Sequence, residues 1–156
     1  MPDETMLYQQ LRDNEHETLV AEFWRFSTSY ALRSESERLI SIHDGLPPNL
    51  YQALRETFQL NDKQVEALLN ASISTLHRRR REGKNLNSVA SERLDRIATM
   101  SQLAMMVFED KPGAINWLTR SNKALGGQVP IMLCKTEIGV KQVRRMLYAM
   151  KCGGVV

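Results

Sequence analysis

Residues 61–83 read NDKQVEALLNASISTLHRRRREG, and this stretch decides the fold. Asn61 is a preferred residue type at the start of a helix, and Asn70 tolerates the left-handed backbone that a tight turn between helices needs. Ser72 is placed to cap a second helix, and Gly83 is placed to end it. Two helices joined by a turn of about three residues, with a third helix before them, predict a helix-turn-helix.

The second helix of this motif carries a basic face. Four polar side chains follow one another at intervals of three, one and three residues, which places them on one side of the helix. They are Ser74, His77, Arg78 and Arg81. Arg79 and Arg80 flank this side, and Leu76 points the opposite way, into the domain. Favourable charge at a helix end would explain some of these cations, but four consecutive arginines exceed what capping requires. We therefore interpret the six polar residues as a DNA-binding surface, with side chains for base edges and cations for phosphates.

The rest of the chain is also predicted to be helical, because apolar residues recur at intervals of three and four rather than two. Ser34 followed by Glu37 indicates one helix start, and Asn87 indicates the start of a long helix. The predicted buried side of that long helix carries Val89, Leu94, Ile97, Ala98, Met105 and Phe108. Further helix starts are predicted at Asp110, Pro130 and Thr136. We predict an all-α fold.

A turn at residues 44–48 is the best candidate boundary, because it reads Asp-Gly-Leu-Pro-Pro. We predict a helical N-terminal extension over residues 1–45 and a helix-turn-helix domain over residues 46–86. A small C-terminal helical domain is predicted over residues 87–156.

Length and composition exclude several protein classes. The chain has 156 residues, of which 42% are apolar and 25% charged, as in an ordinary soluble domain. Its longest apolar run is six residues, whereas a membrane-spanning helix needs about 20. The first seventeen residues are acidic and polar, unlike a secretory signal. Two cysteines far apart indicate a reducing compartment, so we expect a cytoplasmic protein.

Charge is distributed unevenly along the chain. Residues 1–45 hold nine acidic and four basic side chains, whereas residues 101–156 hold three acidic and eight basic ones. A basic body of this kind is suited to a polyanionic partner, although chance scatter over solvated helix faces would produce a similar pattern.

Patterns typical of enzymes are missing from the sequence. His16, His43 and His77 fall in three different segments without a nearby ligand at metal-binding spacing. There is no phosphate-cradling loop and no dinucleotide-binding glycine fingerprint. We therefore predict no metal site, no cofactor and no catalytic residues.

Trp117 and the segment after it have two interpretations. A lone tryptophan is commonly a large core residue. Alternatively, the loop after Trp117 and the helix after Pro130 form a docking face for a protein partner. Physical arguments leave these two interpretations equally supported.

The motifs together resemble the Xre/ParS/MbcA-type antitoxins. In the helix-turn-helix part the resemblance rests on residues 42–47, residues 68–79, Leu86 and residues 91–94. In the C-terminal part it rests on residues 114–118, Asn122, residues 124–127, Pro130, Leu133, Thr136, Gly139, Leu147 and Gly153. It covers roughly residues 42–156 and leaves residues 1–41 unexplained.

The resemblance implies an antitoxin of a type II toxin–antitoxin pair. Its partner would be a RES-domain toxin that consumes NAD, and the antitoxin would mask the toxin's active site and repress the shared operon as a DNA-bound dimer. The implied toxin-binding residues are Trp117, Asn122, Leu125, Gly126, Gly127 and Pro130. The chain departs from the usual family pattern at Asn70, Ser121 and Cys134, and its last residue is not aromatic.

The C-terminal tail is a further candidate for toxin binding. Gly153 and Gly154 do not continue a helix readily, so Val155 and Val156 are expected to project beyond the last packed turn. A short apolar tip that ends in a carboxylate fits the cleft of an enzyme that binds NAD phosphates.

Two other functions remain open. The chain could be a free-standing repressor whose C-terminal domain serves only for dimerisation. It could also be a pure protein inhibitor whose basic helix never contacts DNA.

Overall fold

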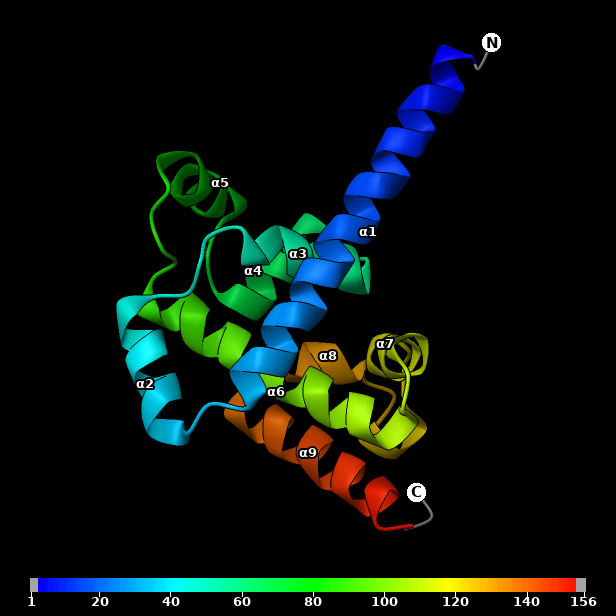
Figure 1. Ribbon diagram of the computed structural model, residues 1–156. Coiled ribbons are helices and arrows are strands. Elements are labelled where there is room, and N and C mark those ends of the chain that lie inside the picture. The colour runs from blue at the N-terminus through cyan, green and yellow to red at the C-terminus, as the bar shows by residue number, and fades with distance from the viewer. Residues whose placement is uncertain (1–2, 154–156) are drawn as a thin grey trace.

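The computed structural model describes residues 3–153, and in that part of the chain it is all-α, as predicted. The helices are α1 (Glu4–Ala31), α2 (Glu35–Asp44), α3 (Leu50–Phe58), α4 (Asp62–Leu69), α5 (Ile73–Glu82), α6 (Ser88–Phe108), α7 (Lys111–Thr119), the 3₁₀ helix η1 (Lys123–Leu125), α8 (Pro130–Leu133) and α9 (Glu137–Lys151). Figure 1 shows α9 and the C-terminal end at one side of the molecule and the free end of α1 at the other.

Helix α6 is the central element. It contacts α1, α2, α4, α7 and α9. Figure 1 shows it running through the middle of the molecule, between α1 and α9. Its buried side includes Leu94, Ile97 and Ala98, as predicted. Val89 was predicted to be buried but is 45% exposed, because at about 100° per residue it lies on the side of α6 away from Leu94 and Ala98.

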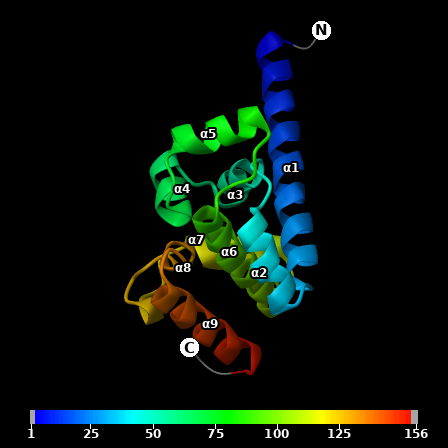
Figure 2. The same ribbon diagram turned by 90° about the vertical axis from the view of Figure 1, so that its left-hand side faces the viewer.

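Helix α1 has two halves with different surroundings. In its second half Phe23, Trp24 and Tyr30 are buried, and the Phe23 ring makes edge contacts with Trp24 and with Phe58 of α3. Its first half projects beyond the rest of the molecule in both views (Figures 1 and 2). The predicted N-terminal extension therefore shares the core through only part of its length.

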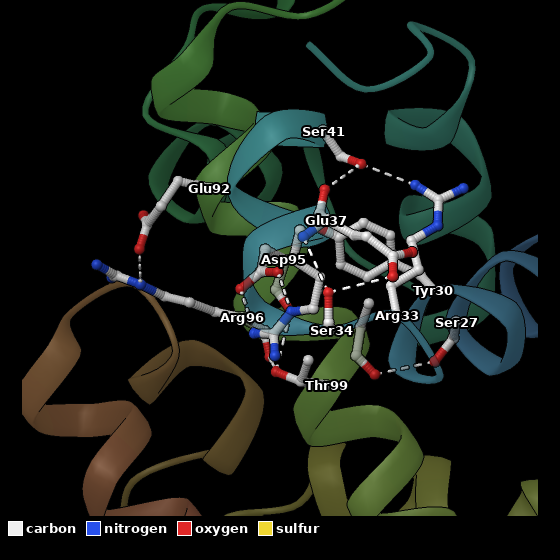
Figure 3. Close-up of polar contacts among 12 residues, drawn as sticks. Ser27, Tyr30, Arg33, Ser34, Glu37, Ser41, Glu92, Asp95, Arg96 and Thr99 are labelled. Atoms are coloured by element: carbon white, nitrogen blue, oxygen red, sulfur yellow. Dashed lines mark hydrogen bonds and ion pairs between the residues drawn. The ribbon is translucent and has the colours of Figure 1, made fainter. Parts of the chain in front are cut away.

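A polar cluster fastens α1 and α2 to α6 (Figure 3). Arg38 of α2 donates from Nε and Nη2 to the two carboxylate oxygens of Asp95, at 2.8 and 3.0 Å. The Tyr30 hydroxyl donates to Asp95 at 2.8 Å, and Ser27 donates to the carbonyl of Ala98 at 2.9 Å. Burial and the hydrogen bond to Asp95 raise the pKa of Tyr30, so its phenol keeps its proton. The cluster lets polar groups enter the core because each of these side chains has a partner.

The predicted helix starts are confirmed by side-chain caps. Each capping oxygen accepts a backbone N–H two or three residues inside its helix. The caps are Ser34, Asn61, Ser72, Asn87, Asp110 and Thr136. Asn61 and Gln64 form a reciprocal capping box, and Pro130 begins α8.

The predicted boundary turn packs closely against the loop before α6. Gly45 has φ of +92°, and a Cβ there would lie 2.3 Å from the carbonyl oxygen of Leu86. The Leu86 amide donates to the carbonyl of Leu46 at 2.9 Å, which joins the two segments. The boundaries that we placed after residues 45 and 86 stay predictions.

Candidate functional site

The helix-turn-helix consists of α4, a short turn and α5. Asn70 ends α4 in the left-handed conformation, with φ of 50°, and Ser72 caps α5 by accepting from the amide of Thr75. Leu76 is buried and anchors α5 to the domain, and Gly83 ends the helix at φ of +64°. The local sequence therefore fixes both the start and the end of the basic helix.

The six predicted DNA-binding residues of α5 lie at different depths. Ser74, Arg78, Arg80 and Arg81 are exposed, whereas His77 and Arg79 are half-buried. A shallow hollow of about 480 Å³ is lined by Ser74, His77, Arg80 and Arg81. No acidic side chain of residues 3–153 forms an ion pair with Arg78, Arg80 or Arg81. These three cations are therefore available to a polyanion.

His77 is held by the helix that precedes the motif. Its Nδ1 shares a hydrogen bond with the hydroxyl of Tyr51, which is buried in α3, and the two rings meet edge to face at 5.4 Å. This contact orients the imidazole on α5, and Nε2 is the ring nitrogen that stays available to a ligand. Sequence spacing predicted the place of His77 on the helix but not its contact with Tyr51.

Arg79 has a structural contact of its own. Its Nη1 donates to the carbonyl of Asn85 at 3.1 Å, and Lys84 donates its amide to the Arg79 carbonyl at 2.9 Å. Arg79 therefore supports the loop between α5 and α6 in addition to adding charge.

Asn122 organises the second predicted binding region. Its side chain accepts from the amide of Ala124 at 2.9 Å, and its backbone pairs with Gln128 in an isolated β-bridge. Its Nδ2 also contacts the sulfur of Met146 at 3.6 Å. Gly126 and Gly127 close this turn at φ of +69° and +80°, where side chains are strained.

A groove lies between this turn and α9. It has a volume of about 490 Å³, and the lining residues are Ala124, Leu125, Gly126, Gln142, Arg145, Met146 and Ala149. Arg145 and Gln142 were not among the predicted site residues. The signal for them was their position on the side of α9 opposite the buried stripe of Val140, Val143 and Leu147.

The other predicted binding residues are spread over three places. Trp117 is half-buried on α7, where its ring lies 6.1 Å from that of Phe108. Pro130 is buried at the start of α8, so in the free chain its ring is not open to a partner. Gly153 is exposed after α9, and Gly154, Val155 and Val156 lie outside the described residues.

Gly139 keeps α8 and α9 in close contact. A Cβ at this position would lie 1.9 Å from the carbonyl oxygen of Leu133, so only glycine fits at the first turn of α9. The buried faces of both helices depend on this approach.

Two known protein families match the chain, one at each of the two candidate binding regions. A family described as the antitoxin Xre-like helix-turn-helix domain matches residues 37–98, which include α5. A family described as the antitoxin Xre/MbcA/ParS C-terminal toxin-binding domain matches residues 103–153, which include the groove. The chain belongs to the Xre/MbcA/ParS-type antitoxins. It combines a DNA-binding helix-turn-helix with a toxin-binding domain.

A curated relative is similar to this antitoxin over nearly the whole chain. Antitoxin Xre of Pseudomonas putida is 27% identical over 145 residues, which cover 93% of this chain and 90% of that protein. The similarity therefore extends into α1, beyond the residues that the two families match.

Two further observations concern the part of the chain that the structure describes. None of its helices has the length and apolar character needed to cross a bilayer. Residues 3–153 contain no group of three His, Cys, Asp or Glu side chains placed to hold a metal ion.

Proposed function

We propose that this antitoxin neutralises a RES-domain toxin, an enzyme that consumes NAD, by covering its active site. It also represses its own operon by binding operator DNA as a homodimer in the cytoplasm, and it needs no cofactor and performs no catalysis of its own. The motif series from Trp117 to Gly139 supports the RES class of partner. The observation that carries the DNA-binding role is the set of three exposed arginines on α5 that form no ion pair within residues 3–153.

The two binding surfaces lie far apart. Figure 2 shows α5 at one end of the molecule and α9 at the other, with α6 between them. Operator DNA and toxin therefore do not compete for the same surface, and both fit on one antitoxin chain at once.

On the toxin side, the groove between η1 and α9 supports a specific contact. Leu125, Met146 and Ala149 offer an apolar floor, and Arg145 adds a cation at the rim. We assign this groove to an apolar side chain of the toxin, with a toxin carboxylate next to Arg145. Trp117, with Asn122 and the glycine turn, completes the surface, Pro130 supports it from the core, and the tail from Gly153 to Val156 enters the toxin's cleft.

The DNA-binding role is tested by gel shift on the upstream promoter at several salt concentrations. Arg78→Ala or Arg81→Ala is expected to weaken binding by about 1–3 kcal/mol and to relax sequence specificity, because each guanidinium contacts a base edge. Arg79→Ala or Arg80→Ala is expected to weaken binding to all sequences and to flatten the salt dependence, because phosphate contacts release counterions.

Arg120→Ala is the matched control, because Arg120 is exposed and lies outside α5. Unchanged promoter affinity in a folded variant without the four α5 arginines would refute the DNA-binding role and leave a pure protein inhibitor.

The toxin-binding role is tested by expressing the antitoxin with the RES-like enzyme encoded beside it. We expect rescue of growth and preserved cellular NAD. The α5 variants are expected to rescue fully, because their surface is separate from the groove. No RES-like neighbour, or no rescue, would favour a free-standing repressor.

The tail is tested by deleting residues 153–156. The melting temperature and DNA binding are expected to stay nearly unchanged, because Gly153 is exposed, while inhibition of the toxin weakens. If the shortened chain still blocks NAD consumption at the same stoichiometry, the tail is dispensable and the helical body covers the active site.

A further inference from the structure

The hollow on α5 is lined by hydrogen-bond donors. Its lining residues are Ser74, His77, Arg80 and Arg81. Arg80 and Arg81 are permanently charged, and neither forms an ion pair with an acidic side chain of residues 3–153. A ligand that carries negative charge and accepts several hydrogen bonds fits these donors, and a phosphate group has both properties.

The hollow lies on one flank of α5. At about 100° per residue, Arg78 lies about 160° from the buried Leu76 and points away from the domain. His77 and Arg80 lie on one flank, about 100° and about 40° from Leu76. The major groove of DNA is about 12 Å wide, close to the diameter of a helix, so the flanks of an inserted helix meet the phosphates at the groove walls. His77 is therefore placed for a phosphate, although its spacing along the helix predicted a base edge.

The hydrogen bond between Tyr51 and His77 determines which imidazole nitrogen carries the proton. Tyr51 of α3 is 0% exposed, and its hydroxyl meets Nδ1 of His77. Within residues 3–153 this is the one hydrogen bond of that hydroxyl. A buried phenol needs an acceptor for its proton, so Tyr51 donates and Nδ1 accepts. A neutral imidazole has a single N–H, so the proton of His77 lies on Nε2, at the far side of the ring.

We propose that Tyr51 is a positioning residue for operator binding. By donating to Nδ1 it holds His77 in the Nε2–H tautomer, and Nε2 donates to a phosphate oxygen of the DNA backbone in the hollow, beside the guanidinium of Arg80. The edge-to-face contact of the two rings, whose centroids are 5.4 Å apart, restricts the imidazole further. The phosphate contact rests on the proposed DNA-binding role, whereas the tautomer does not.

The tautomer is tested without DNA, by heteronuclear NMR of the imidazole nitrogens of the full chain at pH 8, where an ordinary imidazole is neutral. A spectrum of His77→Gln identifies the signals of His77. We expect the Nε2–H tautomer in the parent chain and a measurable fraction of the Nδ1–H tautomer in Tyr51→Phe, which keeps the buried ring and removes only the hydroxyl. Tyr8→Phe, which changes an exposed tyrosine, is the matched control. An Nδ1–H tautomer in the parent chain, or equal tautomer populations in the parent chain and Tyr51→Phe, would overturn the positioning role.

The phosphate contact is tested by the affinity of the full chain for a duplex of the upstream promoter, at pH 8 and several salt concentrations. His77→Ala is expected to weaken binding about tenfold at every salt concentration, because a neutral donor to a charged acceptor adds affinity without releasing a counterion. Arg80→Ala is the matched control, since it removes a cation and is expected to flatten the salt dependence. Unchanged affinity of His77→Ala, or a flattening equal to that of Arg80→Ala, would overturn the contact between a neutral His77 and phosphate.

Single base-pair substitutions in the same duplex distinguish a phosphate from a base as the acceptor. If His77 contacts a phosphate, each substitution is expected to weaken binding by the same factor in His77→Ala and in the parent chain. Arg78→Ala is the comparison, because losing a base contact is expected to remove the penalty at one base pair. The same loss of a penalty in His77→Ala would assign His77 to a base edge and overturn the phosphate contact.

A double-mutant cycle tests whether Tyr51 acts through His77. Tyr51→Phe alone is expected to weaken promoter binding about threefold, and it is expected to have no further effect in the His77→Ala background. Losses that add in the double variant would overturn the positioning role. A parent chain that binds no DNA would refute the DNA-binding role together with the phosphate contact, whereas normal binding by His77→Ala would refute the contact alone.

Discussion

Cys134 is a buried cysteine, and its thiol behaves as an apolar side chain would. The side chain is 1% exposed at the end of α8, and Sγ donates to the carbonyl of Pro130 at 3.7 Å. Burial raises the pKa of this thiol to about 12, because the thiolate would lose its hydration. Cys134 is therefore a packing residue and a poor nucleophile.

This burial predicts a specific loss of stability in alkali. An unfolded chain releases the Cys134 proton above pH 9.0, its ordinary pKa, whereas the folded chain keeps it until about pH 12. The unfolded state then binds fewer protons, so the free energy of unfolding falls as pH rises, by up to about 1.4 kcal/mol per pH unit. Urea unfolding between pH 8 and 11 is expected to show a smaller slope for Cys134→Val. Cys152→Ser, which removes an exposed thiol, is the control and should keep the parent slope.

Asp95 is the residue on which three helices depend. It is 8% exposed and accepts from Arg38 twice and from Tyr30 once. Asp95→Ala would leave a partly buried guanidinium and a buried phenol without their acceptor. The free-energy cost of leaving these groups unpaired exceeds the net stabilisation that the intact pair provides. We expect a loss of about 2–3 kcal/mol in the free energy of unfolding, since the Arg38 side chain is 26% exposed and water compensates in part.

Glu92 offers the matched control on the same helix. It accepts from Arg96 at 2.7 Å, but its side chain is 40% exposed, so Glu92→Ala is expected to cost no more than about 0.5 kcal/mol. Equal losses for the two variants in chemical denaturation would contradict the role of Asp95.

At the scale of helices, α8 and α9 illustrate how one glycine sets a packing distance. Gly139→Ala would place a methyl group against the Leu133 carbonyl, which is backbone and does not swing away. We expect α9 to shift, with a loss of about 2 kcal/mol or more in stability and a marked loss of toxin binding, while DNA binding stays intact. Thermal unfolding and toxin pull-down measure the two effects.

Gly83→Ala is the comparison for Gly139→Ala. Gly83 has φ of +64° but no atom within 4 Å of the added Cβ, so only backbone strain of about 1 kcal/mol is expected. A Gly139→Ala chain that is as stable as Gly83→Ala and binds toxin normally would refute the packing argument.

Helix starts were predictable from sequence, because caps are local interactions between residues three apart. Ser34, Asn61 and Ser72 each accept a backbone amide three residues along, at the predicted helix starts. Burial was less predictable, because it depends on which helices from distant parts of the sequence pack against a given helix face. Val89 and Leu11 have apolar side chains at helical spacing, yet both are exposed.

In the candidate site, too, local features could be predicted from sequence and contacts between distant residues could not. The basic residues of α5 could be identified from spacing alone. The contact between His77 and Tyr51, the support that Arg79 gives to the next loop, and the place of Arg145 beside η1 join residues distant in sequence. No periodicity within one helix contains that information.

At the scale of the whole molecule, the two family regions share a helix. The helix-turn-helix match ends at residue 98, the toxin-binding match begins at residue 103, and both points lie inside α6. Leu94 and Ala98 before this junction and Leu103 and Ala104 after it are buried in one hydrophobic core cluster. We therefore expect the chain to unfold in one cooperative transition, observed by calorimetry and circular dichroism at the same temperature.

An inserted alanine tests this continuity. Placed after Thr99, it would move one half of α6 out of register with its neighbours and is expected to lower the melting temperature by more than about 10 °C. An alanine inserted between the exposed Lys84 and Asn85 is the control and is expected to lower it by only a few degrees, because loops accept length changes. Two separate transitions in the parent chain, or equal effects of the insertions, would contradict a shared helix.

The unbroken passage of α6 from one region to the other also limits how such antitoxins diversify. Each residue gained or lost between positions 98 and 103 rotates everything beyond it by about 100° and shifts it by about 1.5 Å. A recombination event that gives this DNA-binding half a new toxin-binding half must therefore join the two genes in the same helical phase. Insertions and deletions between relatives are expected to accumulate in the loops at residues 83–87 and 120–129. The length of α6 is expected to stay constant between relatives that bind different toxins.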